Sequence, residues 1–396
     1  MIQPFDTPIP VTQPFLPPLD CFCDALHEIW ESRWLTNNGP IVQRFAGSLA
    51  GITDTENLCL FNNGTLALQI GLQGLGVKGE VITTPFTFVA TTHALHWNNI
   101  RPVFVDIEPD YYTLDPERVE AAITPWTTAI LAVHVYGHPC RLAELSEIAE
   151  RRNLLLIYDA AHSFGVRVDG RSIARYGDLS MFSFHATKLF HSLEGGMLVF
   201  PDADLQESLD YLKNFGFRSE TEVALVGTNA KMNEMQALMG ETVLIYLPEI
   251  IEKRRALYER YRDGLSSIQG VHLVAPLPEN VEYNYAYMPI EIDEAEFGMS
   301  RDGLYEALKQ YNVYSRRYFY PLVCDFSCYS EMPLTQPIPV ARAVSSRIMT
   351  LPLYFDLSLE SVDRICEMVA FIQRKASAIQ QLEPMVVQPT ARYGCT

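Results

Sequence analysis

The sequence predicts an α/β protein with a large, mostly parallel sheet covered by helices on both faces, followed by a smaller α/β domain. Short, continuous apolar runs recur between residues 56 and 200, amphipathic stretches separate them, and the pattern changes near residue 245. Buried parallel strands are apolar throughout because helices cover both sides of their sheet. A chain of 396 residues also exceeds one simple core. We therefore assign the N-terminal arm and large domain to residues 1–245 and the smaller domain to residues 246–396.

The predicted elements follow in chain order. Residues 1–55 form an irregular arm with one helix, roughly Leu19 to Ser32, and then a loop from Trp34 to Pro40 that is rich in turn formers. The predicted strands of the large domain are 58–62, 80–84, 102–106, 129–134, 154–159, 179–184 and 197–200. The elements predicted for the smaller domain are a charged helix at 249–265, a strand within 283–292, a helix at 301–311 and a last helix near 358–381.

The composition excludes two classes of partner. Lysine and arginine number 30 against 48 aspartate and glutamate, which gives a net charge of -18. A surface this acidic repels phosphate backbones, so we expect no nucleic-acid partner. Apolar runs of about 18 residues are absent from the sequence, so we also expect no membrane span.

The cysteines and histidines predict neither disulfides nor a metal site. Eight cysteines are scattered without zinc-ribbon spacing, which favours free thiols and a cytoplasmic protein. The N-terminal residues include prolines where a signal peptide needs an apolar run. His134 and His138 are four residues apart, but a glycine between them argues against a helix that presents both to a metal.

Asp159 and Lys188 each follow a predicted strand. A carboxylate at the end of the apolar run LLLIYD is costly to bury unless it meets a cation, and the protonated pyridine nitrogen of pyridoxal phosphate (PLP) is such a cation. A partly desolvated lysine in FSFHATK can have a lowered pKa and form a Schiff base. The alternatives are a helix-capping aspartate and a surface lysine.

Two further strand ends carry groups suited to the same cofactor. Gly64 and Thr65 stand between a strand and a helix, where free amides and a hydroxyl bind phosphate, and Ser183 is a second possible donor. Phe86 and Phe88 follow another strand, where an aromatic ring stacks on a pyridine. An ordinary N-cap turn and core aromatics are the alternatives. Together the four strand ends predict a phosphate site, a stacking ring, a pyridinium partner and a Schiff-base lysine.

Six runs carry a resemblance to a known family: NNGTLAL, TTPFTFVAT, PVFVDIEPD, IYDAAHSFG, FSFHATKLFHSLEGG and TNAKMNEMQA. They resemble the DegT/StrS-type nucleotide-sugar aminotransferases, which have the aspartate-aminotransferase fold, type I, of PLP-dependent transferases. The resemblance covers roughly residues 8 to 380. The runs VTQPFLPPL and LTNNGP look like the branch that aminates C4 of a thymidine-diphosphate 4-keto-6-deoxyglucose.

The resemblance implies roles for the residues of the cofactor site. Lys188 looks like the lysine that binds PLP and moves the proton, and Asp159 looks like the partner of the pyridine nitrogen. His162 is expected beside them, against the 3-oxygen of the ring. The other implied contacts are Gly64, Thr65 and Ser183 with the phosphate, Phe88 rather than Phe86 with the ring, and Asn229 with the phosphate in the neighbouring subunit.

The resemblance also implies substrates and an assembly. It indicates sugar-nucleotide contacts at Arg316, Arg317 and Tyr318, and Lys231 is a further candidate cation for a diphosphate in this acidic protein. L-Glutamate is expected to give its amino group to PLP, and the resulting pyridoxamine phosphate passes it to a keto-deoxysugar nucleotide. Because Asn229 is expected to act across subunits, we predict a homodimer with shared active sites. A metal is not required.

Alternative functions stay open at this point. An aminotransferase acting on C3 of a thymidine-diphosphate 3-keto-6-deoxyhexose would share the cofactor residues. A sugar dehydratase of the same family would carry histidine in place of Lys188. A PLP-binding regulator would need a basic DNA-binding module, and a nicotinamide oxidoreductase would need a glycine fingerprint after a strand; the sequence contains neither.

Overall fold

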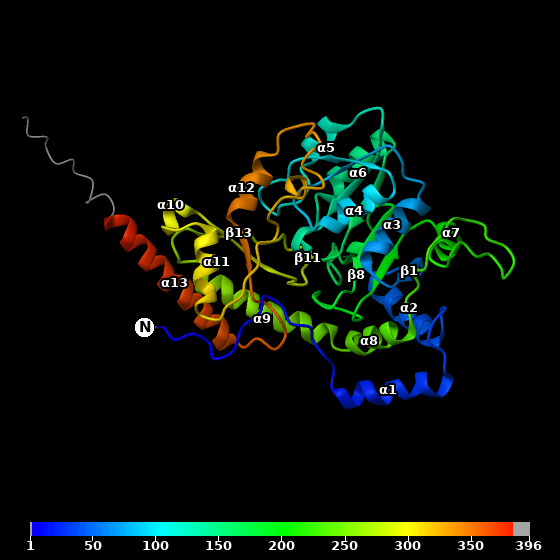
Figure 1. Cartoon of the computed structure of the whole chain (residues 1–396), viewed down its shortest axis with the longest axis horizontal. Helices are drawn as coiled ribbons and strands as arrows, with labels where there is room; N and C mark the ends of the chain where they lie inside the picture. The colour runs from blue at the N-terminus through cyan, green and yellow to red at the C-terminus, as the bar shows by residue number, and fades with distance from the viewer. Residues whose placement is uncertain (1, 383–396) are drawn as a thin grey trace, which may run out of the picture.

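The structure, a computed structural model, describes residues 2–382 of the chain. Figure 1 shows a large body that contains the strands of residues 58–200 and a smaller body, with α9 to α13, at its side. The N-terminal segment starts beside the smaller body and leads to α1 (Leu19–Ser32) below the larger one. The predicted α/β class is confirmed, and the boundary at residue 245 stays a prediction.

The central sheet has seven strands in the order β1-β9-β8-β5-β4-β2-β3. Neighbouring strands are parallel except at β9, which runs antiparallel to both β1 and β8. Each strand overlaps one of the predicted apolar runs, so the mostly parallel sheet is confirmed. The strands are β1 (Leu58–Phe61), β2 (Glu80–Thr83), β3 (Arg101–Phe104), β4 (Thr127–Val133), β5 (Leu155–Asp159), β8 (Leu179–Ser183) and β9 (Gly196–Val199).

Helices cover both faces of this sheet because successive strand residues point to opposite sides. Phe61 and Leu131 share a core with α3, α4 and α7. Their chain neighbours Leu60 and Ile130 face the other side, toward α2 and α8 and toward α5 and α6 respectively. The helices are α2 (Pro40–Thr53), α3 (Gly64–Gly74), α4 (Val89–Trp97), α5 (Pro116–Ala122), α6 (Leu142–Arg152), α7 (Leu205–Leu212) and α8 (Glu234–Leu244).

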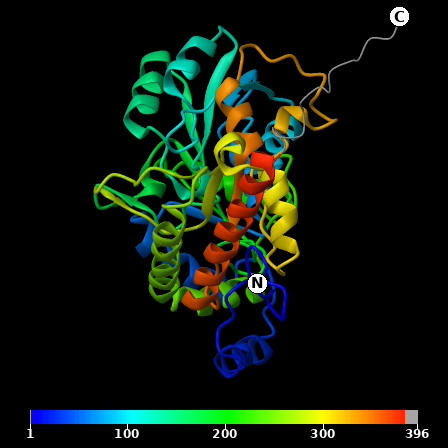
Figure 2. The same cartoon turned by 90° about the vertical axis from the view of Figure 1, so that its left-hand side faces the viewer.

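The smaller body is built on a three-stranded antiparallel sheet, β10-β12-β13. Figure 2 shows α13, in red, between α9 and α11. Phe5 of the N-terminal arm lies in the same hydrophobic core, and Ile9 pairs with Val313. The elements are β10 (Val271–Leu273), β12 (Met288–Ile292), β13 (Ile348–Leu351), α9 (Leu247–Leu265), α10 (Glu294–Phe297), α11 (Arg301–Lys309), α12 (Pro339–Arg347) and α13 (Leu359–Leu382); a third sheet joins β6 (Arg167–Val168), β7 (Arg171–Ser172) and β11 (Val281–Glu282).

The prediction of a single helix in residues 1–55 is wrong. The helix at Leu19–Ser32 is present, but α2 follows it from Pro40 to Thr53. Pro40 belongs to the helix because proline is tolerated in the first turn, where its missing N–H has no acceptor in any case. Ile41, Phe45 and Leu49 repeat at helical spacing and are fully buried, a pattern that the turn-rich residues before it obscured.

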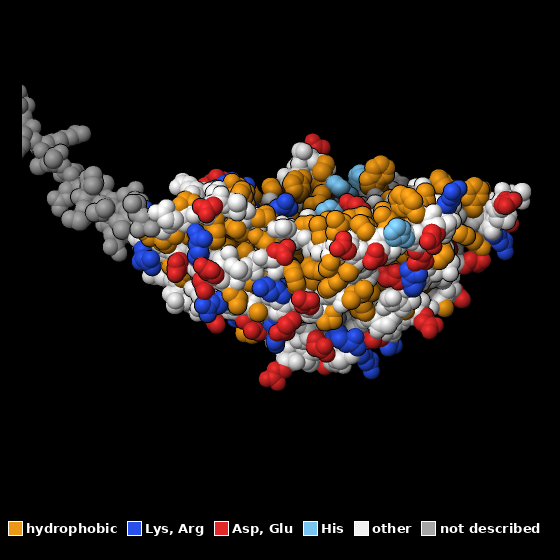
Figure 3. Space-filling view, turned by 90° about the horizontal axis from the view of Figure 1, so that it is seen from below, with side chains coloured by type: hydrophobic (Ala, Val, Ile, Leu, Met, Phe, Trp, Pro, Cys, Tyr) orange, Lys and Arg blue, Asp and Glu red, His pale blue; other side chains and the backbone are white. Residues whose placement is uncertain are grey.

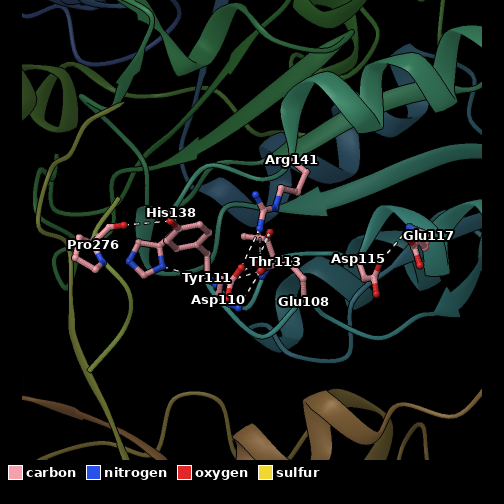
Figure 4. A network of polar contacts seen from close by, with 9 residues as sticks. All are labelled: Glu108, Asp110, Tyr111, Thr113, Asp115, Glu117, His138, Arg141 and Pro276. Atoms are coloured by element: carbon pink, nitrogen blue, oxygen red, sulfur yellow. Dashed lines mark hydrogen bonds and ion pairs between the residues drawn. The ribbon is translucent and has the colours of Figure 1, made fainter. Parts of the chain in front are cut away.

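The loop after β3 joins the two bodies (Figure 4). Glu108 accepts hydrogen bonds from the backbone amides of Asp110, Tyr111 and Thr113 at 2.9 to 3.1 Å, and it also pairs with Arg141 at 3.6 Å. Because these donors hold the loop in place, the Tyr111 hydroxyl reaches the backbone carbonyl at residue 276, which follows β10, at 3.1 Å. The network therefore fixes the edge of the sheet against the smaller body.

The structure also bears on three expectations from the sequence: the membrane span, the cysteines and His134. Within residues 2–382, every helix is too short or too polar to cross a membrane. The seven cysteines in this range are free, while Cys395 lies outside it. His134 stacks on Tyr158, and its Nδ1 accepts from the backbone N–H of Cys140 at 3.0 Å. His134 is therefore part of the packed core.

Candidate active site

A cavity opens at the carboxyl ends of the parallel strands, where open α/β sheets bind ligands. It encloses about 240 Å³. Residues at or just beyond the ends of β2, β4, β5 and β8 line it, namely Thr87, Val133, Asp159 and Ser183. The tertiary structure thus brings together strand ends that are up to about a hundred residues apart in sequence.

The first turn of α3 and the end of β8 form one side of the cavity. Gly64 and Thr65 begin α3, where backbone N–H groups have no acceptor inside the helix. Asn63 caps the turn, since its Oδ1 accepts from the amide of Leu66 at 2.8 Å. A Cβ on Gly64 would lie 3.0 Å from the Cβ of Ser183, so glycine allows this close approach. Two amides and two hydroxyls face a space suited to an anion such as phosphate.

Asp159 ends β5 as a buried carboxylate with two donors. Thr91 Oγ1 donates to its Oδ2 at 2.7 Å, and the amide of Ala161 donates to its Oδ1 at 3.1 Å. Burial raises the pKa of Asp159, while the two donors and the amine of Lys188 act in the opposite direction. Residues 160–166 form turns and no α-helix, so the interpretation of Asp159 as a helix cap is wrong.

Lys188 lies in the segment after β8, with its side chain partly exposed in the cavity. Desolvation lowers the pKa of Lys188, although Asp159 and Tyr318 act to raise it. The segment is held by His185, whose Nδ1 accepts from the amide of Thr187 at 3.1 Å and lies 2.8 Å from its Oγ1. Lys188 is therefore not a surface lysine, and its lowered pKa makes the neutral, nucleophilic form of the amine easier to reach.

His162 lines the same cavity as a neutral ring of defined tautomer. Burial lowers its pKa well below the usual value, and Lys188 adds to that shift. The amide of Tyr136 donates to its Nδ1 at 3.2 Å, so the ring hydrogen belongs on Nε2. Phe319 stacks on the ring with centroids 5.9 Å apart, and Asn284 Nδ2 donates to the His162 carbonyl at 2.8 Å. His162 is thus a fixed hydrogen-bond donor.

The two phenylalanines after β2 have different environments. Phe88 lines the cavity and is 57% exposed, whereas Phe86 is fully buried and packs edge-on against Tyr112, Tyr136 and Phe319. The ring available for stacking on a ligand is therefore that of Phe88. Phe86 belongs to the hydrophobic core behind the cavity.

The predicted substrate residues are only partly brought together. Arg316 and Tyr318 line the cavity, and Arg316 Nη1 donates to the Tyr318 hydroxyl at 2.5 Å. Arg317 instead pairs with Asp302 at 3.0 Å and lies over the ring of Tyr305 at 4.8 Å, in an adjoining hollow. Because this segment is extended, the side chain of Arg317 points away from the side on which Arg316 and Tyr318 lie. The arginine pair in the sequence does not by itself reveal this difference.

Asn229 and Lys231 lie outside the cavity, in a second adjoining hollow that Thr65 and His185 also line. Lys231 Nζ donates to the side-chain oxygens of Asn214 and Asn229, at 2.7 and 2.9 Å. Within one chain these two residues therefore stay at the outer edge of the site. Their open side faces solvent in the single subunit.

Sequence reasoning missed three polar residues of the site. Thr91 contacts Asp159, and Thr87 contacts Thr91 at 3.0 Å. The sequence offered little signal for this pair, because Thr87 lies in the bend before α4 while Thr91 lies in its first turn. Tyr287 packs edge-on against His162 with centroids 4.8 Å apart, and burial raises its pKa to about 12. The alternating tyrosines of YNYAY pointed to such a position.

Comparisons with known proteins agree with this geometry. Residues 20–370 match the model of the DegT/DnrJ/EryC1/StrS aminotransferase family. The chain is 44% identical to a dTDP-4-amino-4,6-dideoxy-D-glucose transaminase of Shigella dysenteriae, over 93% of this chain and 100% of the relative. It is 42% identical to a transaminase of the same name from Escherichia coli, over 92% and 98%. The crystal structure of DesI with its TDP-sugar product superposes with a TM-score of 0.91, at 36% identity, covering 96% of this chain and 97% of that one.

The sheet topology, the cavity at its strand ends and these likenesses define a PLP-dependent aminotransferase with the fold of the sugar aminotransferases. The chain belongs to the DegT/DnrJ/EryC1/StrS aminotransferase family. The family dehydratases predicted to carry histidine at the lysine position are thereby set apart, since Lys188 occupies the cavity here. Membership of this aminotransferase family also excludes a PLP-binding regulator and a nicotinamide oxidoreductase as the function of the chain.

Proposed function

We propose that the protein transfers the amino group of L-glutamate to C4 of thymidine-diphosphate 4-keto-6-deoxyglucose, giving the 4-amino-4,6-dideoxyglucose nucleotide. The observation that carries this proposal is the 44% identity with the Shigella dysenteriae transaminase, which spans the whole of that relative. The second support for an aminotransferase is the set of polar side chains and backbone amides that line the cavity. We also propose a cytoplasmic location, on the basis of the free thiols in the described range.

PLP fits the groups that line the cavity. Among the described residues, Asp159 is buried with two neutral donors and without an ion pair, and a protonated pyridine nitrogen would supply the missing cation. The first turn of α3 offers amides where the cofactor has its phosphate. The residues proposed to hold PLP are Gly64, Thr65 and Ser183 at the phosphate, Phe88 at the ring face, Asp159 at the ring nitrogen, His162 at the 3-oxygen and Lys188 at the aldehyde carbon.

When bound, PLP supplies an aldehyde that captures amines and a protonated ring that draws electrons. Lys188 would hold the cofactor through Nζ and would move a proton to and from the substrate carbon that bears the nitrogen. The lowered pKa of Lys188 suits this task, because a base works best with a pKa near the working pH. Asp159 would keep the positive charge on the ring nitrogen. His162, with its hydrogen on Nε2, would favour negative charge on the 3-oxygen.

The nucleotide part of the substrate is proposed to extend outward past Arg316 and Tyr318. The cavity of about 240 Å³ is smaller than a typical pocket of roughly 300 to 1,000 Å³, so the nucleotide of a bound sugar nucleotide would extend beyond it. Arg316 supplies a local cation for the diphosphate in a protein of net charge -18. Arg317, tied to Asp302, and Lys231, in the outer hollow, are proposed as more distant contacts.

We expect the purified enzyme with PLP and L-glutamate to aminate thymidine-diphosphate 4-keto-6-deoxyglucose at C4. The measurement is a two-dimensional NMR spectrum of the product nucleotide, which locates the carbon that bears nitrogen. The thymidine-diphosphate 3-keto isomer, and the uridine- and guanosine-linked 4-keto sugars, serve as parallel substrates. Nitrogen at C3 would favour the alternative aminotransferase, and turnover with uridine or guanosine nucleotides alone would overturn the choice of nucleotide.

A homodimer that shares its active sites is part of the proposal. Large apolar side chains are exposed at the outer hollow: Trp97 (76%) and Phe215 (48%) line it, and Trp34 (50%) donates from Nε1 to the carbonyl of Thr36, which also lines it. Figure 3 shows hydrophobic side chains, in orange, spread across the face seen from below. A second chain that packs over the outer hollow would cover these rings and bring its own Asn229 toward the phosphate site.

Mixing two inactive variants tests this assembly. Lys188→Ala and Asn229→Ala each disable every site of their own homodimer if Asn229 acts in trans, but a mixed dimer regains one site with both wild-type residues. A statistical mixture is expected to reach about one quarter of wild-type turnover, because about half of the dimers are mixed and each has one working site. The measurement is turnover after the chains are unfolded and refolded together.

The control for this mixing experiment is Lys188→Ala refolded with Asp159→Asn, two residues of one chain's cavity. Because both residues act within one chain's cavity, this pair is expected to restore no site, and co-purification of two differently tagged chains shows that mixed dimers form. If the Asn229→Ala mixture stays as inactive as this control although mixed dimers form, each site uses its own Asn229.

A further inference from the structure

We propose that Thr87 and Thr91 form a directed hydrogen-bond relay that positions Asp159 and keeps its carboxylate ionised toward the ring nitrogen of the cofactor. Thr91 is a positioning residue in this proposal, because it acts through Asp159 and lies behind it. The inference rests on the proposed function, since it requires a pyridine ring in the cavity.

The relay lies between the start of α4 and the end of β5. Thr91 Oγ1 is 2.7 Å from Asp159 Oδ2, and Thr87 Oγ1 is 3.0 Å from Thr91 Oγ1. Both threonines are almost fully buried, at 3% and 1% exposure, so bulk water does not compete for these bonds. Thr87 lies in the bend just before α4 and Thr91 lies in its first turn, so the N-terminus of this helix places both hydroxyls next to the carboxylate.

The direction of the relay follows from the donor inventory. An ionised carboxylate only accepts hydrogen bonds, so the hydroxyl hydrogen of Thr91 points to Asp159. The lone pairs of Thr91 Oγ1 are then free to accept, so Thr87 is the donor of the second bond. Thr87 itself lines the cavity. The relay therefore runs from the cavity wall to the carboxylate and stabilises its charged form.

A second donor fixes the plane of the same carboxylate. The amide of Ala161 holds Oδ1 at 3.1 Å, while Thr91 holds Oδ2. One bond to each oxygen, one from α4 and one from the turn after β5, restrains rotation of the carboxylate about its terminal bond. The backbone on either side is also tied, since the Asp159 carbonyl accepts from the amide of His134 at 3.1 Å. The threonine supplies the one anchor in this set that a side-chain substitution can remove.

The other ionisable groups near Asp159 show what the hydrogen bond from Thr91 contributes. Lys188, after β8, is the nearby cation and lowers the pKa of Asp159, but its nitrogen is committed once it holds the cofactor. His162 is neutral because burial lowers its pKa, and Cys140, after β4, is a neutral thiol because burial raises its pKa. The hydrogen bonds from Thr91 and Ala161 are thus the remaining protein contributions that oppose desolvation of the carboxylate.

The chain contains a matched control one residue away. Thr92 is also on α4 and fully buried, yet its Oγ1 has no hydrogen-bond partner among the described residues. Thr92→Val removes a hydroxyl of the same kind and depth without touching Asp159. Replacing an unsatisfied buried hydroxyl by a methyl group is neutral or stabilising.

The experiment measures PLP binding to the cofactor-free protein by equilibrium dialysis over a series of pH values. Thr91→Val is expected to raise the Kd for PLP by about tenfold or more, because a hydrogen bond to a charged group is lost. The loss of Asp159 stabilisation raises the pKa of that carboxyl, so affinity should fall off at a higher pH as the solution is acidified, by about one pH unit or more. Thr91→Ser, which keeps the hydroxyl, and Thr92→Val should both follow the wild type.

Each outcome distinguishes the relay from the function. If Thr91→Val and Thr92→Val give the same Kd and the same acid limb, the relay is wrong while the aminotransferase proposal stands. If the wild type itself does not retain PLP, the proposed function fails and the relay with it. If Thr91→Val misfolds, as judged by circular dichroism, Thr91→Ala is the second variant. A wild-type Kd for PLP in Thr91→Ser, together with a raised Kd in Thr91→Ala, supports the relay.

Discussion

Lys188→Ala is expected to reduce turnover by more than about 10⁴-fold while leaving the fold unchanged. Proton transfer by a positioned side chain contributes about 10²- to 10⁴-fold, and the variant also loses covalent capture of the cofactor. The side chain lies in a cavity that is open to substrate, so its truncation leaves the packed core intact. The measurements are steady-state turnover and thermal unfolding of the wild type and the variant.

Two companion experiments separate the role of a nucleophile from that of a simple cation. Reduction of the PLP-loaded wild type with borohydride should attach a stable pyridoxyl group to Lys188, which peptide mapping locates. Lys188→Arg keeps the positive charge but cannot be deprotonated, so it should be as inactive as Lys188→Ala. A label on another lysine, or substantial turnover of the arginine variant, would sink the assignment.

Asp159→Asn is expected to bind PLP yet lose about 10²- to 10³-fold in turnover, the range seen when one electrostatic contact to developing charge is removed. A neutral amide cannot stabilise a protonated pyridine nitrogen, so the ring draws electrons less strongly. The amide can still accept from Thr91 or from the backbone of Ala161, which preserves the local structure. The measurements are turnover and the Kd for PLP.

Asp178→Asn is the matched control for this variant. Asp178 is also tied to β5, but at its other end, where Oδ2 accepts from the amide of Leu156 at 2.7 Å. The control is expected to keep wild-type turnover because it lies away from the cavity. Near-normal turnover of Asp159→Asn would show that the carboxylate has only a structural role.

Much of the fold follows from local sequence signals. The strands of the central sheet coincide with apolar runs because both faces of a parallel sheet are buried, so each run is apolar regardless of its partners. The helices α1, α9, α11 and α13 carry amphipathic or charged patterns and lie where they were predicted. The helix α2 was missed because turn formers precede it and Gly47 and Gly51 dilute its pattern, although its buried residues recur at helical spacing.

Some features of the site were likewise predictable from the sequence, and others were not. That Asp159, Lys188, Gly64 and Ser183 follow strands is visible in the sequence, and parallel strands bring such ends to one edge. That Phe88 rather than Phe86 faces the cavity came from the family resemblance, and the structure gives the reason, since Phe86 fills the core. The orientation of Arg317 toward Asp302 depends on a side chain from α11, which no pattern near residue 317 contains.

The sequence by itself determined the fold class, the family and the identity of the groups that meet at the cavity, because strand patterns and motif spacing are local properties of the chain. Only the tertiary structure decided how those groups act on one another. The pKa of Lys188 is lowered by surrounding segments, the tautomer of His162 is set by the amide of Tyr136, and Asp159 at the end of β5 is held by Thr91 of α4. Desolvation and hydrogen-bond direction depend on distances between segments that are remote in sequence, and folding alone fixes those distances.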